Sequence, residues 1–330
     1  MLTKPKLYFT SNLGYSELTM PIIGQFVMKF QKMGFDVLEQ FNCTQGIDDP
    51  ILLAEKIKTD VADSDVVFAF LNGEPADGGV FTILGYAAGL KKEVSFYRDD
   101  RRKCTDSDLI FANLMMAVGF NDEVTLQHHC YEKFEELSDQ HKFLAVFSAN
   151  FQSNVNEKIL PKRMPPEKIS AYLANYYGFS ASMKATLLAD LQKTIENTGI
   201  AVLEPFHRAN NVITTSGFDP FAIANNNVRD IEQATIVIAV MNGEPVDVGI
   251  CFELGYAASL GIPCFLLRDD FRMAGSHKDF SLNPIIAMVF QDFSLLKKRF
   301  CTNTESLVEA LRVAIAELDF ETETPTLCCT

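Results

Sequence analysis

The sequence has no tryptophan, little positive charge and no apolar run of the ~18–20 residues that a membrane span requires. Lysine and arginine number 29 against 43 aspartates and glutamates, which gives a formal net charge of -14. An acidic chain repels phosphate backbones and anionic lipid surfaces, so we expect neither nucleic acid nor membranes as partners. The first residues also lack the apolar core of a signal peptide. We therefore expect a cytoplasmic protein whose partners are small molecules.

Several common cofactor and metal motifs are missing as well. The eight cysteines form no C-x-x-C pair, and the five histidines form no metal-binding or Ser-His-Asp pattern. The sequence has no G-x-x-x-x-G-K-[ST] loop and no clear G-x-G-x-x-G fingerprint. These absences predict a reduced protein that uses no metal and no cofactor. They also argue against serine-type and metal-assisted hydrolysis.

What the sequence does contain is an internal repeat. Residues 72–90 and 242–260 are identical at 12 of 19 positions, at a spacing of 170 residues. Both copies contain Asn-Gly-Glu-Pro and Leu-Gly-Tyr-Ala-Ala, followed further on by Arg-Asp-Asp. A chain of 330 residues has the length of two ordinary domains, and this period is too long for a solenoid. The sequence therefore predicts two tandem copies of one domain.

Each copy alternates expected strands and helices, which is typical of a doubly wound parallel sheet that binds ligands beyond the carboxyl ends of its strands. Continuous apolar runs at Val66–Leu71 and Thr235–Met241 indicate central parallel strands. The other elements expected in the first copy are Leu7–Thr10, Phe26–Met33, Val37–Glu39, Leu52–Ala62, Gly79–Leu90 and Val94–Tyr97. Those expected in the second are Ile169–Ala174, Lys184–Glu196, Ala201–Glu204, Phe221–Gln233, Gly249–Leu260 and Pro263–Leu267.

This pattern predicts the domain boundaries. Residues 1–153 form the first domain and residues 168–320 the second. A polar, proline-containing linker at residues 154–167 joins them, and an acidic tail at residues 321–330 is expected to be disordered.

Two acidic residues stand out in the second copy, where a helix follows the third strand. Asp247 comes two residues before Gly249 at the start of this helix, where an N-cap is the ordinary role of an aspartate. Glu253 shares a helical stripe with Gly249 and Ala257 that should face the sheet. A carboxylate on an apolar stripe costs free energy unless it is paired or used in a reaction. Glu253 is therefore a candidate functional residue.

The first copy serves as an internal control for this interpretation. Its equivalent of Glu253 is Ile83, and its equivalent of Asn227 is Ile57. Both polar positions are isoleucine in the same copy, which indicates the loss of one shared polar site rather than two unrelated changes. We infer that the second copy carries a polar site and that the first copy is degenerate.

These residues resemble a known family. Asp247-Val248-Gly249 followed by Glu253-Leu254-Gly255-Tyr256-Ala257 is similar to the signature of nucleoside 2-deoxyribosyltransferases and their nucleotide-hydrolase relatives. The resemblance covers roughly residues 7–120 and 169–290. It implies an α/β fold of two tandem flavodoxin-like, doubly wound domains, each with a parallel sheet of about five strands, that binds a nucleoside over the strand ends.

Carried over residue by residue, the resemblance assigns roles to the second copy. Glu253 would be the nucleophile on the anomeric carbon in a retaining glycosyl transfer. Asp247 would contact the substrate and take part in proton transfer to the leaving base, and Tyr172 would help to position Glu253. Asn227 would hydrogen-bond near the base, and Gly249 would lie in the same substrate-binding segment.

The family also inserts an Asn-Leu-Met segment of one subunit into the site of its neighbour. This sequence has Asn113-Leu114-Met115 in the first copy but Asn283-Pro284-Ile285 in the second. The resemblance thus implies an intramolecular pseudo-dimer with one composite site, in which Asn113 and Met115 reach into the second copy. The alternative is that residues 114–116 are ordinary helical core. Further homo-oligomerisation is left open.

Two departures from the family pattern leave the sugar 5′ end undefined. We find no match for the carboxyl-terminal tyrosine of some members, and the bulky Tyr176-Tyr177-Gly178-Phe179 replaces a small glycine-rich loop. The cations nearest in sequence that could hold a phosphate are Arg229, His207 and Arg208.

Three functions remain in view. The first is a transferase that exchanges purine or pyrimidine bases on 2′-deoxyribose, with nucleosides and nucleobases as its partners. The second is an N-glycoside hydrolase of nucleosides or 5′-monophosphates, and the third is a catalytically silent nucleoside-binding protein. Base specificity, deoxyribose against ribose, and the phosphate requirement stay open.

Overall fold

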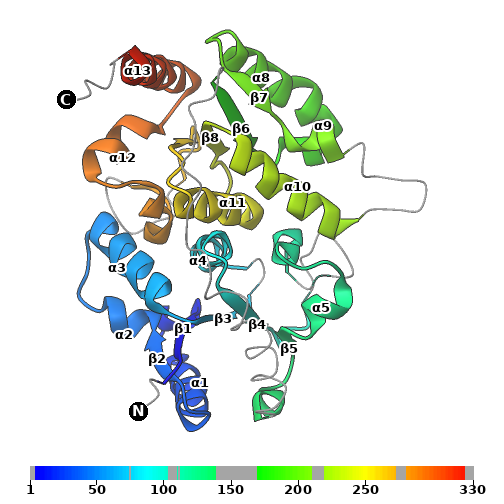
Figure 1. Cartoon of the computed structure of the whole chain (residues 1–330), viewed down its shortest axis with the longest axis vertical. Helices are drawn as coiled ribbons and strands as arrows, with labels where there is room; N and C mark the ends of the chain where they lie inside the picture. The colour runs from blue at the N-terminus through cyan, green and yellow to red at the C-terminus, as the bar shows by residue number, and fades with distance from the viewer. Residues whose placement is uncertain are drawn as a thin grey trace, which may run out of the picture.

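The structure, a computed structural model, describes residues 4–73, 76–102, 110, 112–138, 169–209, 219–272 and 280–323. Each half of the chain forms a five-stranded parallel sheet, with strand orders β2-β1-β3-β4-β5 and β10-β9-β8-β6-β7. These are the same order read from opposite ends, and it is the flavodoxin order. The predicted pair of flavodoxin-like domains is confirmed (Figure 1).

In the first half the elements are β1 (Lys6–Thr10), η1 (Leu13–Tyr15), α1 (Met20–Lys32), β2 (Asp36–Glu39), α2 (Gln40–Thr44), α3 (Pro50–Asp63), β3 (Val66–Phe70), α4 (Gly78–Gly89), β4 (Glu93–Tyr97), η2 (Leu114–Ala117), α5 (Glu123–Gln127), β5 (Cys130–Tyr131) and η3 (Phe134–Ser138).

In the second half the elements are β6 (Ser170–Ala174), η4 (Tyr177–Phe179), α7 (Ala181–Met183), the π-helical turn η5 (Lys184–Leu188), α8 (Ala189–Glu196), β7 (Ala201–Leu203), α9 (Pro205–Ala209), α10 (Pro220–Gln233), β8 (Ile236–Val240), α11 (Val248–Ser259), β9 (Cys264–Leu267), η6 (Pro284–Val289), α12 (Phe293–Arg299), β10 (Phe300–Cys301) and α13 (Thr304–Glu323).

Local sequence explains why the elements near the site begin where they do. The strands β3 and β8 are buried along their whole length, as parallel strands covered on both faces are. The helices α3 and α10 each begin with an aspartate N-cap, Asp49 or Asp219, followed by a proline at the first helical position. Asp77 and Asp247 cap α4 and α11 in the same way, each accepting from a backbone N–H three residues on.

Some predicted boundaries are wrong. The helix expected at Phe26–Met33 begins at Met20, because Pro21 occupies a favourable first-turn position and the helix tolerates Gly24. The helix expected at Lys184–Glu196 starts with the π-helical turn η5, and its α-helical part, α8, begins only at Ala189. The tail expected from residue 321 begins too early, since α13 extends to Glu323. The predicted linker at 154–167 and residues 324–330 lie outside the described residues.

The two halves pack through α4 and α11, which lie against each other at the centre of the molecule (Figure 1). Their backbones are in contact because glycines face the partner helix. A Cβ atom on Gly255 would lie 1.9 Å from the carbonyl oxygen of Thr82, and one on Gly85 would lie 1.9 Å from that of Phe252. The largest buried apolar cluster contains residues of both halves, so the halves share one continuous core. Within the described ranges, no helix is long and apolar enough to cross a bilayer.

Candidate active site

Glu253 lies in the middle of α11, buried between the second sheet and neighbouring helices. Its Oε1 accepts a hydrogen bond from the Tyr172 hydroxyl at 2.6 Å and another from Asn227 Nδ2 at 3.2 Å. Only 5% of Glu253 is exposed, and Tyr172 is fully buried. The carboxylate predicted on the sheet-facing stripe is therefore paired with a strand residue, and three elements hold its position.

The alternation of β6 explains how Tyr172 reaches this carboxylate. Tyr172 and Ala174 face the cluster that contains α10 and α11, whereas Ala171 and Leu173 face the opposite cluster. Asn227 lies on α10 one residue before the buried Val228, at the edge of that helix's apolar face. Strand and helix periodicity thus bring both hydrogen-bond donors to Glu253 from one side of the sheet.

Burial dominates the electrostatics of this group. The pKa of Glu253 is raised to about 8: removal from water is the main cause and the Asp247 charge adds to it, while the hydrogen bonds from Tyr172 and Asn227 oppose the shift. Burial also raises the pKa of Tyr172 well above its usual value, and the Glu253 charge adds to that shift. Tyr172 therefore stays protonated and continues to donate when Glu253 ionises.

Asp247 and Gly249 form the start of α11, beyond the carboxyl end of β8. Asp247 Oδ1 accepts from the Ile250 backbone N–H at 3.1 Å, so the ordinary N-cap role is present. A Cβ atom on Gly249 would lie 3.0 Å from Asp247 Oδ1 and 3.3 Å from Asn113 Oδ1. Two polar side chains therefore converge on this glycine, one from each half of the chain.

The first half reaches the site through η2. Asn113 caps this short 3-10 helix by accepting from the Met115 backbone N–H at 2.9 Å. The Met115 sulfur lies 3.9 Å from Asn227 Nδ2, and both Asn113 and Met115 are buried. The structure thus places the two first-half residues expected at the composite site beside Gly249 and Asn227 of the second half.

The equivalent place in the first half retains part of the same arrangement. Tyr8 occupies the position of Tyr172, but its buried hydroxyl has no hydrogen-bond partner among the described residues. Ile83 stands where the second half has Glu253, and both Ile83 and Tyr8 are fully buried. The orphaned hydroxyl is what remains once the carboxylate is replaced by an apolar side chain.

The reciprocal contact from the second half also persists. A Cβ atom on Gly79 would lie 2.7 Å from Asn283 Nδ2, which mirrors the Gly249–Asn113 contact. Burial raises the pKa of Asp77, the N-cap that corresponds to Asp247. Sequence reasoning missed this second crossing, although the asparagine at 283 was the signal that could have revealed it.

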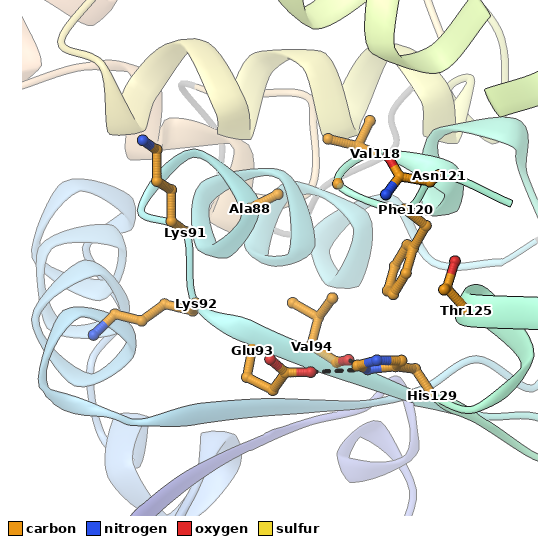
Figure 2. Close-up of a pocket in the computed structure, with 11 residues that line it drawn as sticks. Ala88, Lys91, Lys92, Glu93, Val94, Val118, Phe120, Asn121, Thr125 and His129 are labelled. Carbon is orange, nitrogen blue, oxygen red and sulfur yellow. Dashed lines mark hydrogen bonds and ion pairs between the residues drawn. The ribbon is translucent and has the colours of Figure 1, made fainter. Parts of the chain in front are cut away.

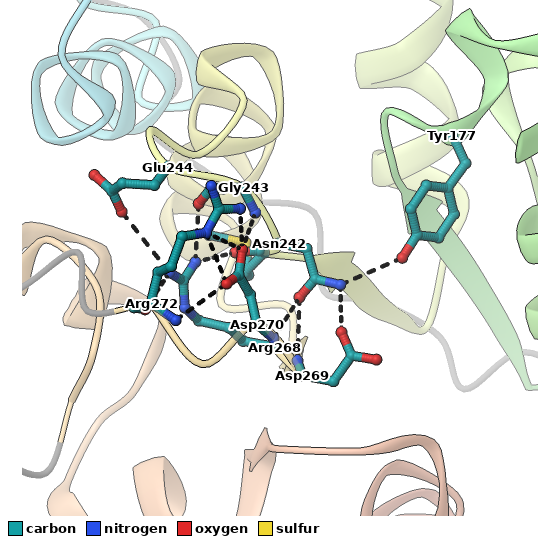
Figure 3. A network of polar contacts seen from close by, with 9 residues as sticks. Tyr177, Asn242, Gly243, Glu244, Arg268, Asp269, Asp270 and Arg272 are labelled. Carbon is teal, nitrogen blue, oxygen red and sulfur yellow. Dashed lines mark hydrogen bonds and ion pairs between the residues drawn. The ribbon is translucent and has the colours of Figure 1, made fainter.

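A polar network supports the loop that leads from β8 to Asp247 (Figure 3). Asn242 Oδ1 accepts from the backbone N–H groups of Asp269 and Asp270 at 3.1 and 3.3 Å. The buried Arg268 guanidinium donates to the carbonyl oxygens of Met241 and Gly243. Sequence reasoning used these residues only as repeat markers. Their recurrence in both copies was the signal, because Asn72 and Arg98 make the same bonds in the first half.

The residues nominated for the sugar 5′ end lie in different surroundings. Asn242 Nδ2 lies 3.4 Å from the Tyr177 hydroxyl, which ties the bulky loop to the network of Figure 3. His207 Nδ1 is 2.9 Å from Glu204 Oε2, so this ring is already paired with a carboxylate. Arg229 is exposed on α10, and the side chain of Arg208 lies outside the described part of the chain.

Across the described residues, no group of three or more His, Cys, Asp or Glu side chains could hold a metal ion. The site instead offers one buried carboxylate, an aspartate at a helix start, a tyrosine hydroxyl and two amides. Such a set, beyond the carboxyl ends of parallel strands, is typical of α/β proteins that bind a small polar ligand.

Comparison with known proteins identifies the family. The model of the family described as nucleoside 2-deoxyribosyltransferase matches residues 7–142 and 171–318, so the chain belongs to this family, with one copy in each half. This confirms the resemblance of the sequence motifs and the tandem duplication.

Among solved structures, the chain is similar to a 2-deoxyribosyltransferase from Bacillus psychrosaccharolyticus, with 20% identity and a TM-score of 0.30 over 38% of this chain and 95% of that one. It is also similar to a 2-desoxiribosyltransferase from Leishmania mexicana, with 19% identity and a TM-score of 0.30 over 38% of this chain and 92% of that one. No match was found among curated proteins.

Proposed function

We propose that this protein is a nucleoside 2-deoxyribosyltransferase that exchanges purine and pyrimidine bases on 2′-deoxyribose at one composite site per chain. The observation that carries the proposal is the setting of Glu253. Both hydrogen bonds to its carboxylate end on Oε1, which leaves Oε2 without a protein partner among the described residues. A buried carboxylate with one oxygen fixed and the other open suits nucleophilic attack on an anomeric carbon.

In the first half-reaction, Glu253 Oε2 attacks C1′ of the deoxyribose. The C1′–O bond forms as the C1′–N bond breaks, and the bonding electron pair leaves with the base nitrogen through an oxocarbenium-like transition state. The departing base gains a proton, because a neutral base leaves more readily than its anion. We assign delivery of this proton to Asp247, which lies beside Gly249 and Asn113 at the helix start.

In the second half-reaction, the nitrogen of an incoming base attacks C1′ from the face that the first base left. The C1′–O bond to Glu253 breaks, the carboxylate is regenerated, and the proton of the incoming base returns to Asp247. Tyr172 and Asn227 stabilise the carboxylate through both steps by donating to Oε1. Asn227, Asn113 and Met115 form the wall that orients the base.

A chromatographic assay tests this reaction. The protein is incubated with 2′-deoxyadenosine, with and without cytosine, and we expect adenine and 2′-deoxycytidine only when cytosine is present. The Glu253→Gln variant keeps the size and both hydrogen-bonding partners, and it should lose at least a thousandfold of the rate while remaining folded. Free adenine without a new nucleoside would establish the hydrolase instead. Retained turnover by Glu253→Gln would end the proposed mechanism.

A further inference from the structure

A pocket separate from the candidate active site lies in the first half, at the amino end of β4. The cavity has a volume of about 430 Å³. Figure 2 shows the side chains around it, which are Ala88, Lys91, Lys92, Glu93, Val94, Val118, Phe120, Asn121, Thr125 and His129, with Gly119 completing the wall. None of these residues belongs to the candidate active site, so the cavity needs an explanation of its own.

A buried histidine paired with a half-buried glutamate forms one side of this pocket. His129 Nδ1 lies 2.8 Å from the Val94 carbonyl oxygen and 2.9 Å from Glu93 Oε1, so its N–H donates to both. Only 8% of His129 is exposed. Because both contacts use Nδ1, the other ring nitrogen, Nε2, has no protein partner among the described residues and is left for a ligand.

A lysine at the rim supplies positive charge. Lys91 lies in the turn between α4 and β4 with a φ of 56°, and it has no carboxylate partner among the described residues. The neighbouring Lys92 is already engaged, since its ammonium donates to the carbonyl oxygens of Ala62 and Ser64 at the end of α3. A cation without a partner, on a chain of net charge -14, indicates an anionic group in the ligand.

The remaining wall offers an aromatic face and hydrogen-bonding groups. The Phe120 ring lies 4.8 Å from the His129 ring, edge to face, and Val94 and Val118 continue the apolar surface. Asn121 adds an amide at the opening, whereas the Thr125 hydroxyl there is already bonded to Asp122 in the capping box of α5. A ligand that complements this lining carries a planar ring with polar edges and an acid group.

The second half provides an internal control for this site. At the repeat offset of 170 residues, its equivalents of Lys91, Glu93 and Thr125 are Gly261, Pro263 and Leu295. The equivalent of His129 is Arg299, which lies over the Phe265 ring at 5.3 Å. The second half also has a cavity beside Leu295 and Arg299, but Lys298, Ser306 and Glu309 line it, so the combination of Lys91, Glu93 and His129 is specific to the first half.

The pocket wall is also hydrogen-bonded to α10, the helix that carries Asn227. The Gly119 backbone N–H donates to Asn225 Oδ1 at 3.3 Å, and Asn225 Nδ2 donates to the Phe120 carbonyl oxygen at 3.3 Å. Asn225 lies on α10 two residues before Asn227, and the same wall follows directly on η2. A ligand in this pocket would contact the residues that directly follow η2 in the chain.

We propose that this pocket binds a nucleoside 5′-monophosphate, with the phosphate on Lys91, the base against Phe120 and a base edge on His129 Nε2. This ligand class combines a planar ring, polar edges and an anion in a size that fits the cavity. The site is distinct from the one at Glu253, so the proposal stands whether or not the chain transfers deoxyribose.

Isothermal titration calorimetry with the four deoxynucleoside 5′-monophosphates tests the proposal. All titrations use the Glu253→Gln chain, so that no ligand is turned over. We expect at least one monophosphate to bind, and Lys91→Gln to weaken it about tenfold or more. Lys193→Gln, which removes one exposed lysine of α8, should leave this binding unchanged. Asn121→Ala, a second variant at the exposed opening, should weaken binding severalfold.

Binding of 2′-deoxyadenosine separates the two sites. This nucleoside lacks the phosphate. Its affinity for the active site should therefore be the same whether or not the Glu253→Gln chain also carries Lys91→Gln. The proposal is overturned if none of the four monophosphates binds, or if Lys91→Gln and Lys193→Gln have equal effects on the one that does.

Discussion

Asn113 of the first half lies against Gly249 of the second, so close that a Cβ atom on the glycine would be 3.3 Å from the asparagine oxygen. The reciprocal residue, Asn283, approaches Gly79 in the same way. The fused chain therefore keeps both crossings of a symmetric pair, while only the second half retains Glu253 and Asn227. The contact that reaches the carboxylate half is the one expected to matter for turnover.

This asymmetry predicts different outcomes for two matched variants. Asn113→Ala should lower kcat/KM at least tenfold, whereas Asn283→Ala should leave it within about twofold. Both asparagines cap a 3-10 helix through the backbone N–H two residues on, so each variant should lose a similar ~1 kcal/mol of stability. Steady-state kinetics and thermal unfolding measure both quantities. Equal kinetic effects would argue against a composite site.

The two strand tyrosines form a second matched pair. Tyr172→Phe removes a hydrogen bond to a carboxylate, a contact typically worth ~1.5–3 kcal/mol, and should lower kcat about 10- to 100-fold. Tyr8→Phe removes a buried hydroxyl that has no partner within the described residues, so the melting temperature should rise or stay constant with no loss of rate. A destabilised Tyr8→Phe protein would mean that this hydroxyl is bonded after all.

The raised pKa of Glu253 predicts the pH dependence of the reaction. The nucleophile must be ionised, so kcat/KM should rise with pH through a pKa of about 8, far above that of an ordinary carboxyl. A rate that levels off near pH 5 would show that the free protein holds this carboxylate ionised.

The same shift has a consequence for stability. Because the pKa of Glu253 is about 8 in the folded chain against 4.5 in the unfolded chain, the folded state binds the proton more tightly. The free energy of unfolding should therefore fall between pH 4.5 and 8, by on the order of a few kcal/mol relative to Glu253→Gln, and the difference should be constant above that range. Denaturant unfolding of both proteins across this range measures it.

The interface between α4 and α11 can be tested with a single methyl group. Gly255→Ala places a Cβ atom 1.9 Å from the Thr82 carbonyl oxygen, so the helices must separate. Overpacking of this kind should cost about 3 kcal/mol, and it should lower activity by moving Glu253 relative to η2. Gly24→Ala on α1 is the control, because nothing lies within 4 Å of its new methyl group. That variant should gain about 0.5–1 kcal/mol, and chemical unfolding compares the two.

The sequence by itself determined the architecture and singled out the buried carboxylate. Repeat spacing and alternating strand and helix patterns predicted two doubly wound domains, since strand and helix periodicity depend on local backbone geometry. Glu253 was found because a single charged residue interrupts an apolar stripe whose counterpart, Ile83, is apolar. The start of α1 and the π-helical turn η5 were missed, because propensity along the chain is too weak to set such boundaries.

Only the tertiary structure decided which distant groups meet. The approach of Asn113 to Gly249, the burial of the Tyr8 hydroxyl and the polar pocket around Lys91 and His129 each depend on how the halves and loops pack. Sequence spacing specifies which face of a helix or strand a residue occupies. The residue that faces it across an interface is set by side-chain packing between elements far apart in the chain, and in the centre of this molecule by glycines that let two helix backbones touch.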